Sequence, residues 1–345
     1  MNTNTSVRIP VRKSPRRSAA RVAIAAYAAL TLLGGSPAQA DTLYVSSVNG
    51  NKVYRVSTNG TVTAFATLNL LPEGLAFATN GLLYVANDGG NLINRVTTSG
   101  AVSVFATNIT QPYGLTFDSK GNLYAASQSF PSARVRKIAP DGSVANFGPT
   151  ITAPYGLAVD AADNIYVSST SGGQLYKIAP SGSYSLFGPY LSAPVGLAFD
   201  RNGNLYAALN SGTITRITPA GTGTTFAAGL GNSLVGLAFD NDGNLYAANY
   251  ASGTIFKITP GGTVTSLATV TGNPSFIAVS PPPRFAPGPV TITLSDDDVV
   301  VSWFGNFILQ SAVYAAGPFA DLDNATNPYT NAIANADAAF FRLRN

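Results

Sequence analysis

Few side chains in this sequence could carry out chemistry. The 345 residues include no histidine and no cysteine, and the only glutamate is Glu73. Without histidine the chain lacks Ser-His-Asp triads, most zinc sites and most imidazole general bases. Without cysteine it has no disulfide. The sequence therefore favours a binding or scaffold module over an enzyme, with any site built from carboxylates, amides, hydroxyls and aromatic rings.

The residues that could form such a site occur at one variable position of a recurring motif, Pro-x-Gly-Leu-Ala-Phe. Its first residue is Pro72, Pro112, Pro154 and Pro194, and the motif weakens at Leu234 and Pro274. Turn geometry explains the recurring glycine, but it does not explain why the residue between proline and glycine changes from acid to tyrosine to valine. Variation at equivalent positions is where a specific site could be built. These variable residues are Glu73, Tyr113, Tyr155, Val195, Val235 and Ser275.

A second motif, Leu-Tyr-Val/Ala-Ala/Ser, recurs in step with the first. It begins at Leu43, Leu83, Leu123, Ile165, Leu205 and Leu245, at intervals of 40, 40, 42, 40 and 40 residues. An apolar-x-basic-apolar segment and a glycine turn follow each copy. In one repeat these segments predict strands over Gly74–Phe77, Leu83–Ala86, Ile93–Val96 and Val102–Phe105. Four short strands in about 40 residues are typical of one blade of a β-propeller.

The phase of the repeats predicts how the ring closes. The repeats start at the second strand of a blade, Leu43, and end at a first strand, Phe276–Val279. The last strand must then join the first three strands of the chain in a shared blade, which gives six blades. The alternative is an open β-solenoid, but the split blade favours a closed, all-β six-bladed propeller over residues 41–280.

Blade geometry brings the variable residues together. In a four-stranded antiparallel blade, the start of the first strand and the end of the second lie on one face, around the mouth of the central channel. The residues that follow each second strand are Ser47, Asn87, Ser127, Ser169, Leu209 and Asn249. We expect a ligand at this mouth to contact Glu73, Asn87, Tyr113, Tyr155 and Asn249, with the tyrosines as stacking platforms. Simple packing of the same residues is the alternative.

These motifs resemble those of NHL-repeat propellers and, more distantly, of the gluconolactonase and senescence-marker-protein propellers and the streptogramin lyases. Leu71-Pro72-Glu73-Gly74-Leu75 looks like the segment that carries the metal-binding glutamate of gluconolactonases. The resemblance implies Glu73 as a metal ligand and a metal-dependent hydrolase or lactonase as the alternative function; Asp88, which lies close by, is the second candidate ligand. Where that family has asparagines at the later positions of the motif, this chain has Tyr113, Tyr155 and valines. The streptogramin lyases depend on a histidine, which this chain lacks.

Two further sets of charged residues recur along the repeats. Each third strand carries one basic residue, a spread-out arrangement that favours solvated or carboxylate-paired side chains over a functional patch. Four turns contain an Asp and an Asn four residues apart, and each offers too few carboxylates for a calcium loop, so we interpret them as turns. The basic residues are Arg55, Arg95, Lys137, Lys177, Arg216 and Lys257, and the turns are Asp118–Asn122, Asp160–Asn164, Asp200–Asn204 and Asp240–Asn244.

Residues 1–40 have the features of a signal peptide. They contain six basic residues and no acid, an apolar stretch from Val22 to Leu33, and Ala38-Gln39-Ala40 as a cleavage site. A membrane anchor is the alternative, but about 12 apolar residues are fewer than the roughly 20 that a span needs. We expect cleavage after Ala40 and a secreted or periplasmic protein.

The rest of the chain has 14 basic and 16 acidic residues, a net charge of −2. It therefore has no basic face for nucleic acid. No second apolar stretch is long enough to cross a bilayer, so we expect no transmembrane segment after removal of the leader. We predict a monomer without a cofactor, whose partner is a small molecule, a glycan or a protein.

The repeat stops at Pro281-Pro282-Pro283. A proline-rich linker is predicted over 281–289, and a small β-sandwich over 290–345 that resembles fibronectin-III/immunoglobulin-like modules. Trp303, the only tryptophan, is the expected core anchor of that module. Asp296–Asp298 could bind calcium, although a turn between two strands is the favoured interpretation. The predicted strands are Val290–Leu294, Val299–Trp303, Phe307–Ser311 and Ala339–Leu343.

Overall fold

A computed structural model describes residues 41–280 except 69 and 129–131, together with the backbone of strands between 291 and 344. The predicted leader, the linker and Trp303 lie outside the described residues, as do Asp296 and Asp297. The chain divides into two compact units, of which the larger spans Gln39–Pro282. Each unit is described by itself.

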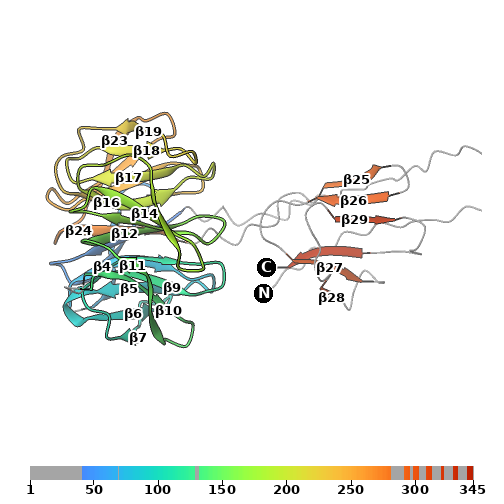
Figure 1. Cartoon of the computed structure of the whole chain (residues 1–345), viewed down its shortest axis with the longest axis horizontal. Helices are drawn as coiled ribbons and strands as arrows, with labels where there is room; N and C mark the ends of the chain where they lie inside the picture. Colours follow the sequence, from blue (N-terminus) through green and yellow to red (C-terminus); the bar gives the residue numbers. More distant parts are fainter. Residues whose placement is uncertain are drawn as a thin grey trace, which may run out of the picture. The chain divides into compact units, whose positions relative to one another are not determined.

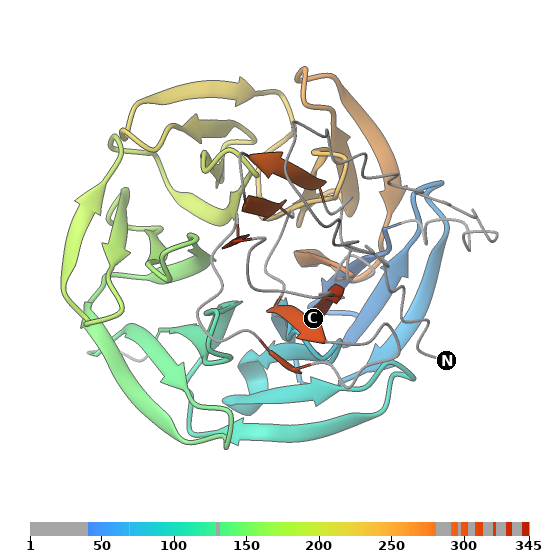
Figure 2. The same cartoon turned by 90° about the vertical axis from the view of Figure 1, so that its right-hand side faces the viewer.

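The larger unit consists of six antiparallel sheets of four strands each, arranged as blades around a central axis (Figure 2). Blade 1 contains β24 (Pro274–Val279), β1 (Leu43–Ser47), β2 (Lys52–Val56) and β3 (Val62–Thr67). Blade 2 contains β4 (Pro72–Phe77), β5 (Leu83–Asn87), β6 (Leu92–Val96) and β7 (Val102–Thr107), with a short 3-10 helix, η1 (Asp88–Gly90), after β5. Blade 3 contains β8 (Pro112–Phe117), β9 (Leu123–Ser127), β10 (Arg134–Ile138) and β11 (Val144–Thr150).

The remaining blades follow the same order, from the inner strand to the outer one. Blade 4 contains β12 (Pro154–Val159), β13 (Ile165–Ser169), β14 (Gln174–Ile178) and β15 (Tyr184–Phe187). Blade 5 contains β16 (Pro194–Phe199), β17 (Leu205–Leu209), β18 (Ile214–Ile217) and β19 (Gly223–Ala227). Blade 6 contains β20 (Leu234–Phe239), β21 (Leu245–Asn249), β22 (Thr254–Ile258) and β23 (Val264–Thr269).

The shared blade predicted from the repeat phase is confirmed. Strand β24 pairs antiparallel with β1, with Leu43 opposite Val279 and Ser47 opposite Pro274. The orange end of the propeller thus lies beside its blue beginning (Figures 1 and 2). Beyond the strands, the amide of Ser280 donates to the carbonyl of Thr42 at 2.8 Å. The ring is closed by hydrogen bonds between residues more than 200 positions apart in the chain.

Each inner strand contains a β-bulge at the Pro-x-Gly motif. In blade 2, Pro72 lies opposite Asn87 and Leu75 opposite Val85, so Glu73 and Gly74 together face a single residue. Bulges of this kind redirect side chains and are common beside functional sites. The bulge places the variable residue of the motif outside the regular pairing of the inner strand with the second strand.

The glycine of the motif is required by the neighbouring blade. A Cβ atom on Gly74 would lie 2.0 Å from the carbonyl oxygen of Tyr113, and one on Gly156 would lie 2.1 Å from that of Val195. Adjacent inner strands therefore approach too closely for any side chain at this position. Blade 1 is the exception, because Phe276 takes the place of the glycine there.

The tyrosine of the second motif packs between neighbouring blades. Tyr84 makes edge-to-face contacts with Phe105 of its own blade at 4.8 Å and with Phe117 of the next blade at 5.1 Å between ring centroids. Tyr206 repeats the arrangement with Phe226 and Phe239. Such pairs add to the burial of apolar surface that stabilises the interfaces between blades.

The C-terminal unit is also built of strands. It has β25 (Thr291–Ser295), β26 (Asp298–Ser302), β27 (Ile308–Ala312), β28 (Ala320–Asp321), β29 (Tyr329–Ala332) and β30 (Phe340–Arg344). They form two three-stranded sheets, ordered β25-β26-β29 and β28-β27-β30. The predicted all-β character of this module is confirmed, and its likeness to immunoglobulin-type modules stays a prediction. In the described part of the chain no helix has the length and apolarity needed to cross a bilayer.

Candidate binding site at the mouth of the ring

The variable residues of the inner strands gather around the axis of the propeller. We call this end, where inner strands begin and second strands end, the mouth. Val195 and Val235 pack there with Phe276 in one buried cluster, to which Tyr155 and Tyr250 add their rings. Apolar side chains from the inner strands of several blades therefore belong to one buried cluster.

Glu73 is buried at the mouth, with 6% of its surface exposed. Ser275, which occupies the equivalent position in blade 1, donates its hydroxyl to Oε2 of Glu73. Burial raises the pKa of Glu73 from 4.5 to about 8; the hydrogen bond from Ser275 opposes this rise, and the nearby carboxylate of Asp88 adds to it. At neutral pH this carboxyl therefore carries a proton.

Three aromatic rings are stacked beside Glu73. Tyr113 and Tyr155 lie 4.5 Å apart between centroids with an interplanar angle of 29°. Tyr155 in turn stacks on Phe276 at 5.7 Å and 14°. Two of these rings come from the variable position of blades 3 and 4, and the third is the residue that replaces glycine in blade 1.

The phenol groups of the stack belong to the same electrostatic cluster as the carboxyls. The pKa of Tyr113 is raised to about 12, mainly by burial and also by the nearby acidic groups of Asp88 and Glu73 and by Tyr250. Burial also raises the pKa of Tyr155, with contributions from Glu73 and Tyr113, while a hydrogen bond with Ser275 opposes the rise. Both tyrosines are uncharged hydrogen-bonding groups at physiological pH.

The two asparagines predicted at the mouth use most of their hydrogen-bonding groups within the protein. Asn249 donates to the carbonyls of Leu230 at 2.8 Å and Asn232 at 3.0 Å, and it accepts from the amide of Ser252. Asn87 donates to Oδ1 of Asn94 at 2.7 Å. The serines at equivalent positions likewise donate to backbone carbonyls of the preceding connection, at 2.6 Å for Ser47, Ser127 and Ser169.

Asn87 keeps one unused group. Its side chain is 1% exposed, yet its Oδ1 atom has no hydrogen-bond partner. In blade 6 the corresponding oxygen of Asn249 accepts a backbone amide three residues further on. Blade 2 forms the 3-10 helix η1 at this point, and Asn87 caps it without a side-chain hydrogen bond. A buried acceptor without a partner is an unusual feature, and it occurs directly beside Asp88.

The residues directly after the last residue of each second strand form another ring at the mouth. The sequence analysis missed all of them except Asp88. Their amides donate to the carbonyls of the residues that precede the inner strands, which fixes them at the mouth. Gln128 also donates its side chain to the carbonyl of Pro154 at 3.3 Å, and Thr170 to that of Pro194 at 3.1 Å. Counting from the end of the second motif could have found them, since they vary as strongly as the first set. They are Val48, Asp88, Gln128, Thr170, Asn210 and Tyr250.

The backbone is strained at the entry to every inner strand. Leu71 (φ 54°), Ala153 (φ 45°) and Ala193 (φ 47°) adopt the left-handed conformation that costs a non-glycine residue about 1–2 kcal/mol. Gln111, Ser233 and Asn273 do the same in the other blades. Strained backbone is concentrated at functional sites in many proteins, and here it surrounds the mouth.

The predicted metal ligands, Glu73 and Asp88, lie near each other. The charge of Asp88 raises the pKa of Glu73, and both groups raise the pKa of Tyr113. No third carboxylate joins them, since the described residues contain no group of three acidic, histidine or cysteine side chains that could hold a metal ion. A hard divalent cation takes six or more oxygen ligands. The donor set therefore fits such an ion poorly.

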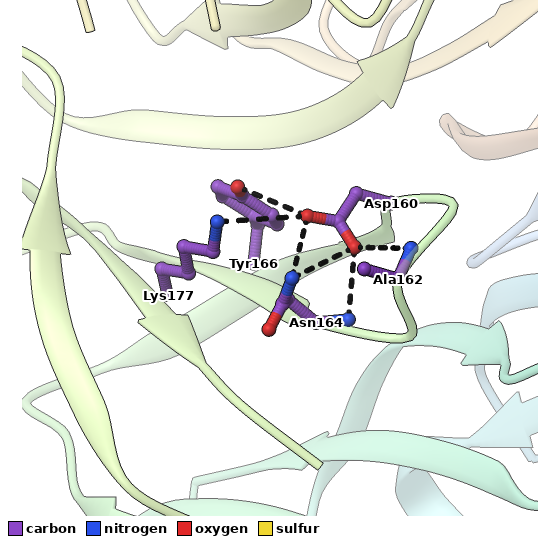
Figure 3. Close-up of polar contacts among 5 residues, drawn as sticks. All are labelled: Asp160, Ala162, Asn164, Tyr166 and Lys177. Carbon is purple, nitrogen blue, oxygen red and sulfur yellow. Dashed lines mark hydrogen bonds and ion pairs between the residues drawn. The ribbon is translucent and has the colours of Figure 1, made fainter. Parts of the chain in front are cut away.

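The repeated Asp turns connect the ends of the inner strands to the starts of the second strands, away from the mouth, and Figure 3 shows the turn that contains Asp160. Oδ1 of Asp160 accepts the amides of Ala162 at 3.0 Å and Asn164 at 2.9 Å, and Oδ2 accepts the hydroxyl of Tyr166 at 3.2 Å. Lys177 lies 3.7 Å from the same carboxylate. Burial raises the pKa of Asp160, but the hydrogen bonds from Asn164 and Ala162 and the charge of Lys177 outweigh it and lower the pKa overall. The interpretation of these segments as turns is confirmed by this geometry.

Comparisons with known proteins place the fold in a family. Residues 33–217, just over half of the chain, match the model of the virginiamycin B lyase family. A chain of a nidogen/laminin complex matches with a TM-score of 0.63 and 16% identity over 70% of this chain and 98% of that chain. A putative gluconolactonase matches with a TM-score of 0.52 and 17% identity over 69% and 84% of the two chains.

A third matching structure was determined with a ligand. A catalytically inactive virginiamycin B lyase from Staphylococcus aureus, with alanine in place of a histidine and with quinupristin, matches with a TM-score of 0.50. Its identity is 17%, over 76% of this chain and 96% of that chain. The search of curated proteins found no match. The structural neighbours confirm the propeller, and because the family model matches more than half of the sequence, this chain belongs to the virginiamycin B lyase family.

Proposed function

We propose that this chain is an exported binding module that holds one ligand at the mouth of its propeller. The observation that carries the proposal is the asymmetry of the mouth. One blade supplies a buried carboxyl, two adjacent blades supply stacked tyrosines, and two supply valines. Because the blades differ from one another at the mouth, an unsymmetrical small molecule or glycan would have a single preferred orientation there.

The absence of histidine from the whole sequence supports binding without the chemistry of the lyases. The inactive Staphylococcus aureus enzyme has lost a histidine and is described with quinupristin. By analogy, a propeller of this family that has no histidine could retain a ligand at its mouth without cleaving it. Export is inferred from the predicted leader, and the C-terminal module would then be carried outside the cytoplasm with the propeller.

A thermal-shift screen of glycans and small metabolites tests the proposal, because a ligand that binds only the folded state raises the melting temperature. Tyr113→Ala removes an outer ring of the stack and should abolish the shift. Tyr184→Ala is the matched control, since Tyr184 is a tyrosine on an outer strand with 57% of its surface exposed. Loss of binding in the control, or only on mutation of Asp118 or Asp240, would place the site away from the mouth.

A further inference from the structure

A highly exposed tyrosine lies on the outer hairpin of blade 4, which is formed by β14 and β15. Tyr190, in the connection after β15, has 74% of its surface exposed, more than any other large hydrophobic side chain of the described residues. It lines a surface hollow together with Gln174, Leu186 and Pro189. The equivalent connection of blade 3 has Thr150 at this place. The exposed ring is therefore not required by the repeat.

The backbone on both sides holds the tyrosine in place. Pro189, whose ring fixes its own backbone dihedral φ, comes directly before it. Leu191, which is buried, comes directly after it and donates its amide to the carbonyl of Gly173 at 2.8 Å. The ring of Tyr190 lies against Gly173, where a Cβ atom would be only 2.3 Å from Cε2. A tyrosine held in this way loses little conformational entropy when a ligand packs against it.

The lining of the hollow combines apolar surface with uncharged polar groups. Leu186 is 55% exposed and, with Pro189, adds aliphatic surface beside the aromatic ring. The side-chain amide of Gln174 and the hydroxyl of Tyr190 have no hydrogen-bond partner among the described residues. Strand β15 is the outer strand of its sheet, so its free edge offers further backbone donors and acceptors. Such a surface matches a ligand with an apolar face and a rim of hydroxyl groups.

The hollow carries no charge of its own. None of the seven residues that line it is acidic or basic. The charged residue of the same hairpin, Lys177, lies 3.7 Å from the carboxylate of Asp160, at the Asp turn of the blade (Figure 3). A neutral ligand therefore fits better than an ion. The lining is also far smaller than the roughly 20–30 residues that each side of a stable protein interface contributes, which favours a small ligand over a second protein.

We propose that this hollow binds a neutral oligosaccharide, with one pyranose ring packed on Tyr190 and its hydroxyls hydrogen-bonded to Gln174. A pyranose whose hydroxyls are equatorial presents only C–H groups on its two faces. One such face can cover an aromatic ring, while the hydroxyls at its edge reach an amide that both donates and accepts. Leu186 and Pro189 flank the sugar. This site is separate from the mouth and does not depend on the ligand proposed there.

Saturation-transfer difference NMR with cellohexaose, a neutral chain of equatorially substituted glucose units, tests the inference on the full-length protein. Sorbitol, which has similar hydroxyls but no ring, is the negative probe. We expect transfer to the C–H protons of cellohexaose and none to sorbitol. Tyr190→Ala should lower the affinity for cellohexaose about tenfold or more, which corresponds to about 1.4 kcal/mol. Tyr190→Phe keeps the ring and should retain most of the affinity, and Gln174→Ala should have an intermediate effect.

The matched control is Tyr184→Ala, which removes another exposed tyrosine of the same hairpin that does not line the hollow. It should leave cellohexaose binding unchanged, as should Tyr113→Ala at the mouth. Absence of binding at about 10 mM, well above a millimolar Kd, would overturn the inference. Equal signals from sorbitol, or unchanged affinity in Tyr190→Ala, would do the same.

Two further outcomes separate this site from other uses of the same residues. If Tyr113→Ala abolishes cellohexaose binding and Tyr190→Ala does not, the proposed function of the mouth stands and this inference falls. If cellohexaose needs Tyr190 while no ligand from the screen needs Tyr113, the inference stands and the proposed function falls. Self-association of the protein that disappears in Tyr190→Ala would assign the surface to a second copy of the chain and would also overturn the inference.

Discussion

The protonated state of Glu73 makes a specific prediction for stability. In the unfolded chain this carboxyl has its ordinary pKa of 4.5, and in the folded protein burial raises the pKa to about 8. A group that binds its proton more tightly when folded makes the folded state less stable as the pH rises above 4.5. The loss continues until the pH reaches about 8 and is constant above it.

The magnitude follows from the two pKa values. One pH unit of difference corresponds to about 1.4 kcal/mol, so Glu73 should cost the folded state about 3 kcal/mol at pH 7 and about 5 kcal/mol above pH 8. Glutamine keeps the shape and the acceptor for Ser275 but never ionises. We therefore expect Glu73→Gln to be more stable than the natural protein by about 3 kcal/mol at pH 7. At pH 4 the carboxyl is protonated in both the folded and the unfolded protein, so its ionisation should no longer contribute to the stability difference.

Thermal unfolding followed by circular dichroism between pH 4 and 9 measures the effect. About 2–4 °C per kcal/mol is expected for a propeller of this size, so the gain at pH 7 should be roughly 6–12 °C. Asp141→Asn is a control of opposite sign. Hydrogen bonds from the backbone and side chain of Ser143 lower the pKa of Asp141, so its removal should reduce stability at neutral pH and not in acid. A stability difference for Glu73→Gln that is independent of pH would refute the burial argument.

Three further predictions concern the ring and its leader. Gly156→Ala should destabilise the propeller by about 1–3 kcal/mol in denaturant titrations, because the new methyl group would lie 2.1 Å from the carbonyl oxygen of Val195. Gly261→Ala is the control and should be nearly neutral, since the nearest atom to its new methyl group would be 3.9 Å away. Equal effects of the two substitutions would contradict the close-approach argument. Deleting 274–345 should unfold the ring because β1 loses β24, whereas deleting 287–345 should leave it folded; a stable monomeric 41–273 fragment would argue against closure by β24. N-terminal sequencing of the exported protein should begin at Asp41, and an intact Met1 recovered outside the cell would exclude cleavage after Ala40.

The sequence by itself determined the architecture of the propeller. Hydrophobic strands and glycine turns recur every 40 to 42 residues, and the offset between Leu43 and Phe276 permits one closure, in which the last strand completes the first blade. Local rules suffice here because each blade repeats the same pattern and contacts its neighbours in the same way. The sequence also identified Glu73, Tyr113 and Tyr155 as unusual, since they break the repeat where its other positions are constant.

Only the tertiary structure decided what those residues do to one another. Glu73 and Ser275 are 202 positions apart, and the closure of the ring brings them into hydrogen-bonding contact. The bulge in each inner strand, the use of Asn249 for backbone carbonyls and the stacking of Tyr155 on Phe276 are likewise absent from any local pattern. The pKa of Glu73 depends on how completely six blades exclude water from the axis, and burial of that kind is a property of the whole ring, which no segment of the sequence contains.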